Sequence, residues 1–79
     1  MHTYSILFFG ASKEISKSSK ISLDSNASDL NGLKAELYAK FNSLEGSVNA
    51  IAVNQQIVQE NVPLKNGDEI AFMPPFSGG

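Results

Sequence analysis

The chain of 79 residues contains no cysteine, no tryptophan and no arginine, and its only histidine is His2. Without cysteine it can form neither a disulfide scaffold nor a thiolate metal site, and it has no thiol nucleophile. Nucleic-acid recognition relies on arginine forks and basic patches, but here six lysines are outnumbered by eight acidic residues, for a net charge of −2. One histidine near a terminus cannot build a metal or catalytic site alone. We therefore expect no nucleic-acid partner, no metal and no bound cofactor.

Long apolar runs are also missing from the sequence. No stretch approaches the ~20 apolar residues that span a bilayer. The segment from Met1 to Leu7 lacks the charged start and the long apolar run of a signal peptide. We expect a cytoplasmic protein without a membrane partner. A chain of this length has room for one small core, so we expect any chemistry to lie at an edge of the domain or on a partner.

Alternating apolar residues predict strands, and one stretch has the spacing of a helix. Leucines at 30, 33 and 37 and a phenylalanine at 41 form a helical stripe after the possible caps at 25–29. We expect Gly46 to end this helix. The polar residues 12–20 are expected to form a hairpin connection. Strands are expected at 3–9, 20–24, 48–53, 57–58 and 69–73.

Between the last strands, the sequence predicts turns and one buried loop. Residues 54–56 are expected to turn, and the loop at 62–64 is expected to insert into the core. Residues 65–68 contain Asn-Gly, which readily takes positive φ, and predict a tight turn before the last strand. Asp68 and Glu69 cannot act as a carboxylate pair, because adjacent strand residues point to opposite faces. Asp68 is instead expected to cap the turn.

The order ββαβββ predicts an α+β fold in which a mixed sheet is crossed by one main helix, the ubiquitin-like β-grasp arrangement. In that arrangement the first and last strands lie side by side in the middle of the sheet. The last strand would then direct the end of the chain out of the most rigid part of the molecule. We expect a single domain over residues 1–79, with a flexible C-terminal tail at 74–79.

The C-terminal segment is the part of the sequence that indicates a chemical function. Pro74 and Pro75 have fixed φ angles and favour an extended arm, which from residue 74 to residue 79 could reach roughly 20 Å. Gly78 and Gly79 have no Cβ, so they can pass through a channel too narrow for other residues. Glycines are also common in frayed termini. The combination of a strand, two prolines, Phe76 and two glycines nevertheless indicates that the terminal carboxylate is the working group.

Four segments are similar to those of a known family. Residues 6–15 resemble its first strand and the turn that follows, with Lys13 in place of the usual arginine. Residues 51–54 read Ile-Ala-Val-Asn, and residues 64–72 resemble the pattern L-x-x-G-D-E-V-A-F. Residues 74–79 resemble the ending P-P-x-(S/A)-G-G. In these segments the chain resembles the small sulfur-carrier subunit of molybdopterin synthase, the MoaD family of ubiquitin-like proteins.

The resemblance implies a mechanism. An E1-like adenylyltransferase would use ATP to adenylate Gly79, and a sulfur donor protein would convert the acyl-adenylate to a thiocarboxylate. The large subunit of molybdopterin synthase would then receive the tail and pass its sulfur to cyclic pyranopterin monophosphate, in molybdenum cofactor biosynthesis. Catalytic acids and bases would belong to the large subunit. The chain alone would therefore not be catalytic, and ATP would be used only by the activating enzyme.

The expected site residues have three roles. Gly79 carries the acyl group, and Gly78, Ser77, Pro75 and Pro74 position the tail. Phe76, Phe72 and Phe9 are expected to form an apolar patch that binds the partner. Packing of Phe76 into the core of its own domain is the alternative for that residue. As a strand residue, Phe72 is expected to serve core or interface packing rather than chemistry.

Two other functions stay open at this point. One is a sulfur carrier of the same fold that serves thiamin synthesis or tRNA thiolation, although such tails usually lack the proline pair. The other is a non-catalytic ubiquitin-like modifier.

Overall fold

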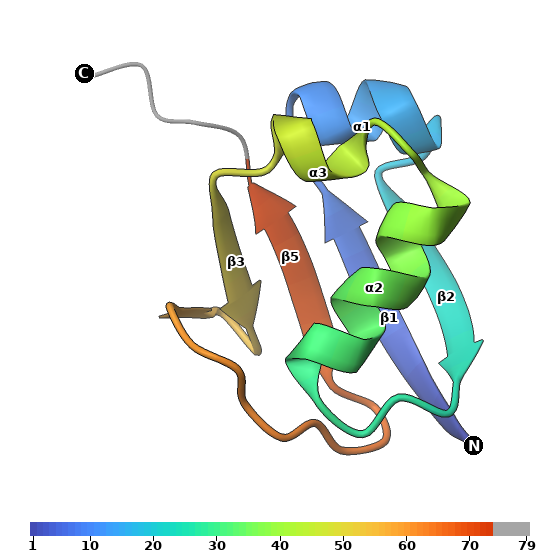
Figure 1. Cartoon of the computed structure of the whole chain (residues 1–79), viewed down its shortest axis with the longest axis vertical. Coiled ribbons are helices and arrows are strands. Elements are labelled where there is room, and N and C mark those ends of the chain that lie inside the picture. The colour runs from blue at the N-terminus through green and yellow to red at the C-terminus, as the bar shows by residue number, and fades with distance from the viewer. Residues whose placement is uncertain (74–79) are drawn as a thin grey trace.

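The structure is a computed structural model, and it describes residues 1–73. Within these residues, five strands form one mixed sheet in the order β2-β1-β5-β3-β4. In Figure 1, α2 lies across one face of the sheet, and α1 and α3 lie at the end where β1 and β5 finish. The strands are β1 (His2–Phe8), β2 (Lys20–Ser25), β3 (Ala50–Val53), β4 (Gln56–Val58) and β5 (Glu69–Met73), and the helices are α1 (Ala11–Ser16), α2 (Leu30–Lys40) and α3 (Leu44–Ser47).

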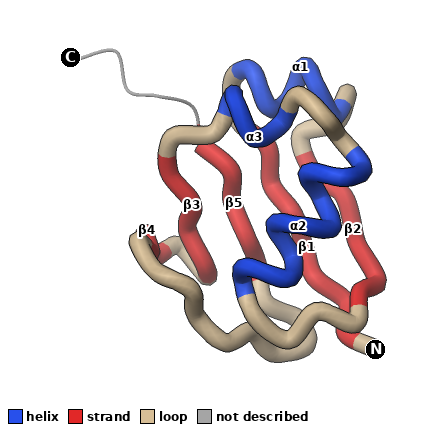
Figure 2. The backbone as a smooth tube through the Cα atoms, viewed as in Figure 1, coloured by secondary structure: helices blue, strands red, loops and turns tan. Residues whose placement is uncertain are grey.

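The centre of the sheet is the parallel pair of the first and last strands. β1 pairs with β5 from Ser5 opposite Glu69 to Phe8 opposite Phe72. The outer neighbours, β2 on β1 and β3 on β5, are antiparallel. A parallel pair needs a crossover connection, and α2 lies within that connection (Figure 2). The predicted α+β sheet with adjacent first and last strands is confirmed.

The predicted helical stripe forms α2. Asp29 caps its first turn, because its side chain accepts a hydrogen bond from the backbone N–H of Gly32 at 2.8 Å. The three leucines of the stripe are buried against the sheet. Phe41 lies just beyond the end of the helix and still packs on the core, with its ring edge-on to Phe8 at 5.9 Å between centroids. α2 therefore covers the centre of the sheet.

Two expectations about helices were wrong. Residues 12–20 are more than a hairpin connection, because α1 occupies their first part. Gly10, at φ 61°, leads into α1, and Lys17, at φ 63°, ends it by donating its backbone N–H to the Lys13 carbonyl. Gly46 does not end α2, which stops at Lys40; it lies inside α3, a short helix that starts at the fully buried Leu44. Both short helices depend on contacts beyond their own sequence, which periodicity does not detect.

Strand boundaries differ by one or two residues from the expected ones. β1 ends at Phe8 and not at residue 9, while β3 begins at Ala50 and not at residue 48. Both shifts occur at the end of the sheet where α1 and α3 lie. The backbone leaves the strand geometry there to join these helices.

The turns between the last strands follow the prediction, except that Gln56, expected in the first turn, already belongs to β4. Asn54 and Gln55 have positive φ angles of 52° and 71°, and Leu64 is buried in the core. Gly67 takes φ 89° in the turn before β5. The Asp68 carboxylate accepts the backbone N–H of Lys65 at 2.8 Å, which confirms its predicted role as a cap of this turn.

Candidate functional site

The end of β5 is the base from which residues 74–79 begin. Its last two carbonyl groups are both held by backbone donors. The Phe72 carbonyl accepts the N–H of Phe9 at 3.1 Å, and the Met73 carbonyl accepts the N–H of Asn49 at 2.9 Å. Ala50 also pairs with Met73 across the sheet. The chain is therefore fixed on both sides up to the residue directly before Pro74.

The buried serine at the start of α1 adds a side chain to this arrangement. The Ser12 hydroxyl is fully buried, donates to the Phe9 carbonyl at 2.7 Å and accepts the Phe9 N–H at 3.1 Å. The same oxygen lies 3.4 Å from the Phe72 carbonyl. Sequence analysis did not single out Ser12, because it belongs to a polar, serine-rich segment. Its one distinguishing signal is its place two residues after Gly10, where β1 turns into α1.

The predicted phenylalanine patch is only partly present in the described residues. Phe72 is 0% exposed and its ring stacks on Phe8 at 5.9 Å between centroids, so it belongs to the core. Of the two roles expected for Phe72, the structure shows core packing, and Phe72 does not contribute to an exposed patch. Ile70 and Phe72, two residues apart on β5, are both fully buried and belong to the same core cluster as the leucines of α2. Phe9 is 47% exposed just beyond β1, so it is accessible to a partner.

The other predicted site residues lie outside the described part of the chain. They are Pro74, Pro75, Phe76, Ser77, Gly78 and Gly79. Their expected roles stay predictions. What the structure supplies is the fixed base of the segment that carries them.

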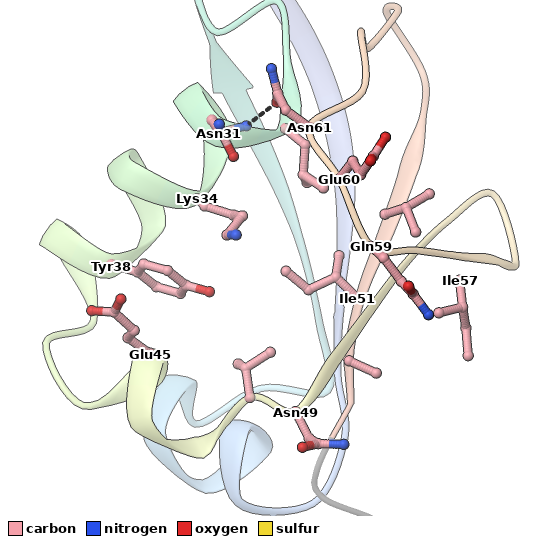
Figure 3. Close-up of a pocket in the computed structure, with 14 residues that line it drawn as sticks. Asn31, Lys34, Tyr38, Glu45, Asn49, Ile51, Ile57, Gln59, Glu60 and Asn61 are labelled. Atoms are coloured by element: carbon pink, nitrogen blue, oxygen red, sulfur yellow. Dashed lines mark hydrogen bonds between the residues drawn. The ribbon is translucent and has the colours of Figure 1, made fainter.

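A cavity of about 670 Å³ opens between α2 and the strands β3 and β4. Lys34 and Tyr38 point from α2 toward Ile51 on β3, while Ile57 points away on the far side (Figure 3). Burial, with a smaller contribution from the Glu45 carboxylate, raises the pKa of the Tyr38 phenol. The side chains that line the cavity in the described structure include no histidine and no aliphatic hydroxyl. They therefore form no hydroxyl–imidazole pair of the kind that nucleophilic catalysis uses.

The described residues also lack a cluster of side chains that could bind a metal ion. Residues 1–73 contain no group of three or more His, Cys, Asp or Glu side chains placed to hold a metal ion. None of the helices in this part of the chain is long and apolar enough to cross a membrane.

The opposite end of β5 is held by a polar cluster. The Asn54 side-chain amide donates to the Asp68 carboxylate at 3.0 Å and accepts the Glu69 N–H at 3.0 Å. The Asn54 N–H in turn donates to the Glu69 carbonyl at 2.7 Å. Two of the segments that carry the family resemblance, 51–54 and 64–72, therefore meet here. They fix the start of the strand whose other end leads into the C-terminal segment.

A mixed sheet crossed by α2, with the first and last strands paired at its centre, defines a ubiquitin-like β-grasp protein. Its distinguishing feature is a C-terminal segment that begins at the held end of β5. The sequence pattern of the ThiS family matches residues 6–79, and the chain belongs to this family. The resemblance found in the sequence is confirmed.

Individual relatives agree with this assignment. The chain is 32% identical over 78 residues to the molybdopterin synthase sulfur carrier subunit of Haemophilus influenzae, with 94% of this chain and 96% of that protein covered. It is 36% identical to a chain in the protein–protein complex of subunits 1 and 2 of molybdopterin-converting factor from Helicobacter pylori, at a TM-score of 0.72 and with 98% and 99% covered. The small archaeal modifier protein 1 of Methanosarcina acetivorans shares the fold, at a TM-score of 0.82 and 21% identity, with 100% and 98% covered.

Proposed function

We propose that this chain is the sulfur carrier subunit of a molybdopterin synthase. The observation that carries the proposal is the match, over 94% of the chain, to the carrier subunit of Haemophilus influenzae. The fold supports it, because the held end of β5 presents the C-terminal segment at the edge of a rigid domain.

The working group in this proposal is the carboxylate of Gly79. A terminal carboxylate has an ordinary pKa of about 3.3–3.7, so at neutral pH it is an anion and a poor electrophile. Transfer of AMP from ATP to its oxygen, with release of pyrophosphate, makes an acyl-adenylate. A persulfide sulfur then attacks the carbonyl carbon and displaces AMP. Cleavage of the resulting acyl disulfide by a thiol leaves the thiocarboxylate.

The chain contributes delivery of the sulfur, and its partners contribute the chemistry. The adenylation requires an E1-like enzyme, the persulfide requires a sulfur donor protein, and the final transfer requires the active site of a large subunit. The Helicobacter pylori complex, in which the similar chain is bound to the other subunit of its converting factor, supports a partner of the last kind. The exposed Phe9 offers an apolar contact for such a partner, and the proposal assigns Phe76 the same role.

Intact-mass measurement tests the proposal. Incubated with an E1-like enzyme, ATP and a sulfur source, the full chain is expected to gain the mass of one oxygen-to-sulfur exchange, localised to its C-terminal peptide. Deletion of Gly79, or addition of one residue after it, is expected to abolish the gain without lowering the melting temperature, since terminal residues ordinarily contribute little packing.

A glycine series adds a matched control. Gly78→Ala is expected to slow the reaction, because the added Cβ obstructs a channel shaped for bare backbone. Gly46→Ala makes the same chemical change at a site where, apart from the neighbouring residues and the backbone of its own helix, no atom lies within 4 Å of the new Cβ, and it is expected to react like the wild type. Thiocarboxylation of the truncated or extended chain would contradict the proposal. Isopeptide conjugates on lysines in cell extract would instead indicate a modifier.

A further inference from the structure

Three hydrogen-bonding groups surround the last two residues of β5, and we refer to them as the β5 clasp: the Phe9 N–H, the Ser12 hydroxyl and the Asn49 N–H. Two of the three come from the backbone. Ser12 is the only member that acts through its side chain, and this side chain is fully buried. It bonds both backbone groups of Phe9 and lies 3.4 Å from the Phe72 carbonyl.

The geometry of the clasp bears on the direction of the C-terminal segment. Met73 precedes a proline, so steric contact with the proline ring restricts its backbone to extended conformations. Pro74 and Pro75 have fixed φ angles, and proline-rich segments stay stiff over several residues. A restraint on the backbone of Phe72 and Met73 would, through these two prolines, also restrict the residues that follow.

We propose that Ser12 is a positioning residue for sulfur transfer. Its hydroxyl fixes Phe9 against the end of β5, and through this contact it sets the direction in which residues 74–79 leave the domain. A segment that already points toward the active site of the activating enzyme loses less freedom when it binds. This inference rests on the proposed function as a sulfur carrier.

The site suits serine better than other small residues. Alanine would leave the Phe9 carbonyl without the donor that it has at 2.7 Å. Threonine would add a methyl group to a position with no exposed surface. Cysteine is close in size to serine but is a weak hydrogen-bond donor. Ser12→Ala therefore removes the hydrogen bonds, and Ser12→Cys weakens them at a similar side-chain size.

Ser16 provides a matched control in the same helix. Its hydroxyl donates to the Ser18 carbonyl at 2.8 Å, accepts the Ser18 N–H at 3.3 Å and lies 3.4 Å from the Lys13 carbonyl, so these hydrogen bonds stay within residues 13–18. We expect Ser12→Ala to lower kcat/KM for thiocarboxylation by about 2- to 10-fold, the equivalent of one hydrogen bond. Ser16→Ala is expected to react like the wild type. All variants are compared at a temperature at which circular dichroism shows them fully folded, and Ser12→Cys replaces Ser12→Ala if the latter does not fold.

A double-mutant cycle separates positioning from simple stability. In a chain with Pro74→Gly and Pro75→Gly the stiff link is gone, so Ser12→Ala is expected to cause no further loss of kcat/KM. An equal loss in both backgrounds, or no loss in either, would overturn the positioning role. These outcomes leave the proposed function intact. Failure of the wild type itself to become thiocarboxylated would contradict the proposed function, so the two failures are distinguishable.

Discussion

At the scale of single residues, Asp68 shows how one buried carboxylate organises a turn. It is 7% exposed, and it accepts hydrogen bonds from the Asn54 amide and from the Lys65 backbone. Burial alone would raise the pKa of its carboxyl. The bonds from Asn54 and the Lys65 N–H, with the positive charge of Lys65, outweigh burial and lower the pKa below its ordinary value of 3.8.

A lowered pKa makes stability depend on pH in a definite direction. The Asp68 contribution is fully present above the unfolded-state pKa, near 3.8, and is lost as the pH falls through the lower pKa of the folded state. We expect the melting temperature of the wild type to fall as acid protonates this group. Asp68→Asn should melt at a lower temperature at neutral pH and lose less on acidification. Glu60→Gln removes an exposed charge and serves as control; identical pH profiles for Asp68→Asn and the wild type would contradict the assignment.

At the scale of elements, the sequence predicted what periodicity and turn chemistry encode. The leucine stripe of α2, the alternation in β1 and the turn at Gly67 were all visible, because each is a local pattern. The short helices α1 and α3 were missed. They have six and four residues and are held by tertiary contacts such as the buried Ser12 and Leu44.

The candidate site was harder to predict for a related reason. The terminal glycines indicated the chemistry of the site. The groups that hold the end of β5, the Ser12 hydroxyl and the Asn49 backbone N–H, come from segments far from it in sequence. Such contacts have no periodic signature. The misplaced Phe72 reflects the same limit, because a strand residue at a sheet end is buried or exposed according to what covers it, and here it lies against Phe8 and Tyr38.

The connection between β1 and the entry to α2 can be tested directly. The buried Tyr4 on β1 donates its hydroxyl to the Ala27 carbonyl at 2.6 Å, in the loop before α2. Tyr4→Phe is expected to lower the free energy of unfolding by about 0.5–1.5 kcal/mol, the net value of one hydrogen bond. Tyr38→Phe removes a hydroxyl that faces the open cavity and should leave stability unchanged. Urea unfolding measures both, and equal values for the two variants would show that the Tyr4 bond does not stabilise the fold.

At the scale of the whole molecule, β5 connects two regions with different tasks. Its start is locked by Asn54 and Asp68, and its end is held by the β5 clasp at the base of residues 74–79. The strand lies at the centre of the sheet, between β1 and β3. In the proposed function the folded domain carries the sulfur atom of the Gly79 thiocarboxylate, and its partners supply the catalytic groups. The exposed Phe9, just beyond β1, is accessible to such a partner.

The most direct measurement is mass spectrometry of the intact protein recovered from its native cell, with fragmentation of the C-terminal peptide. The sulfur-carrier account predicts a fraction of the chains with one oxygen of the Gly79 carboxylate replaced by sulfur. This fraction should increase in cells that lack the large subunit, because the thiocarboxylate then has no acceptor. Recovery of Gly79 solely as a free carboxylate in those cells, or in isopeptide linkage to lysines of other proteins, would contradict the account.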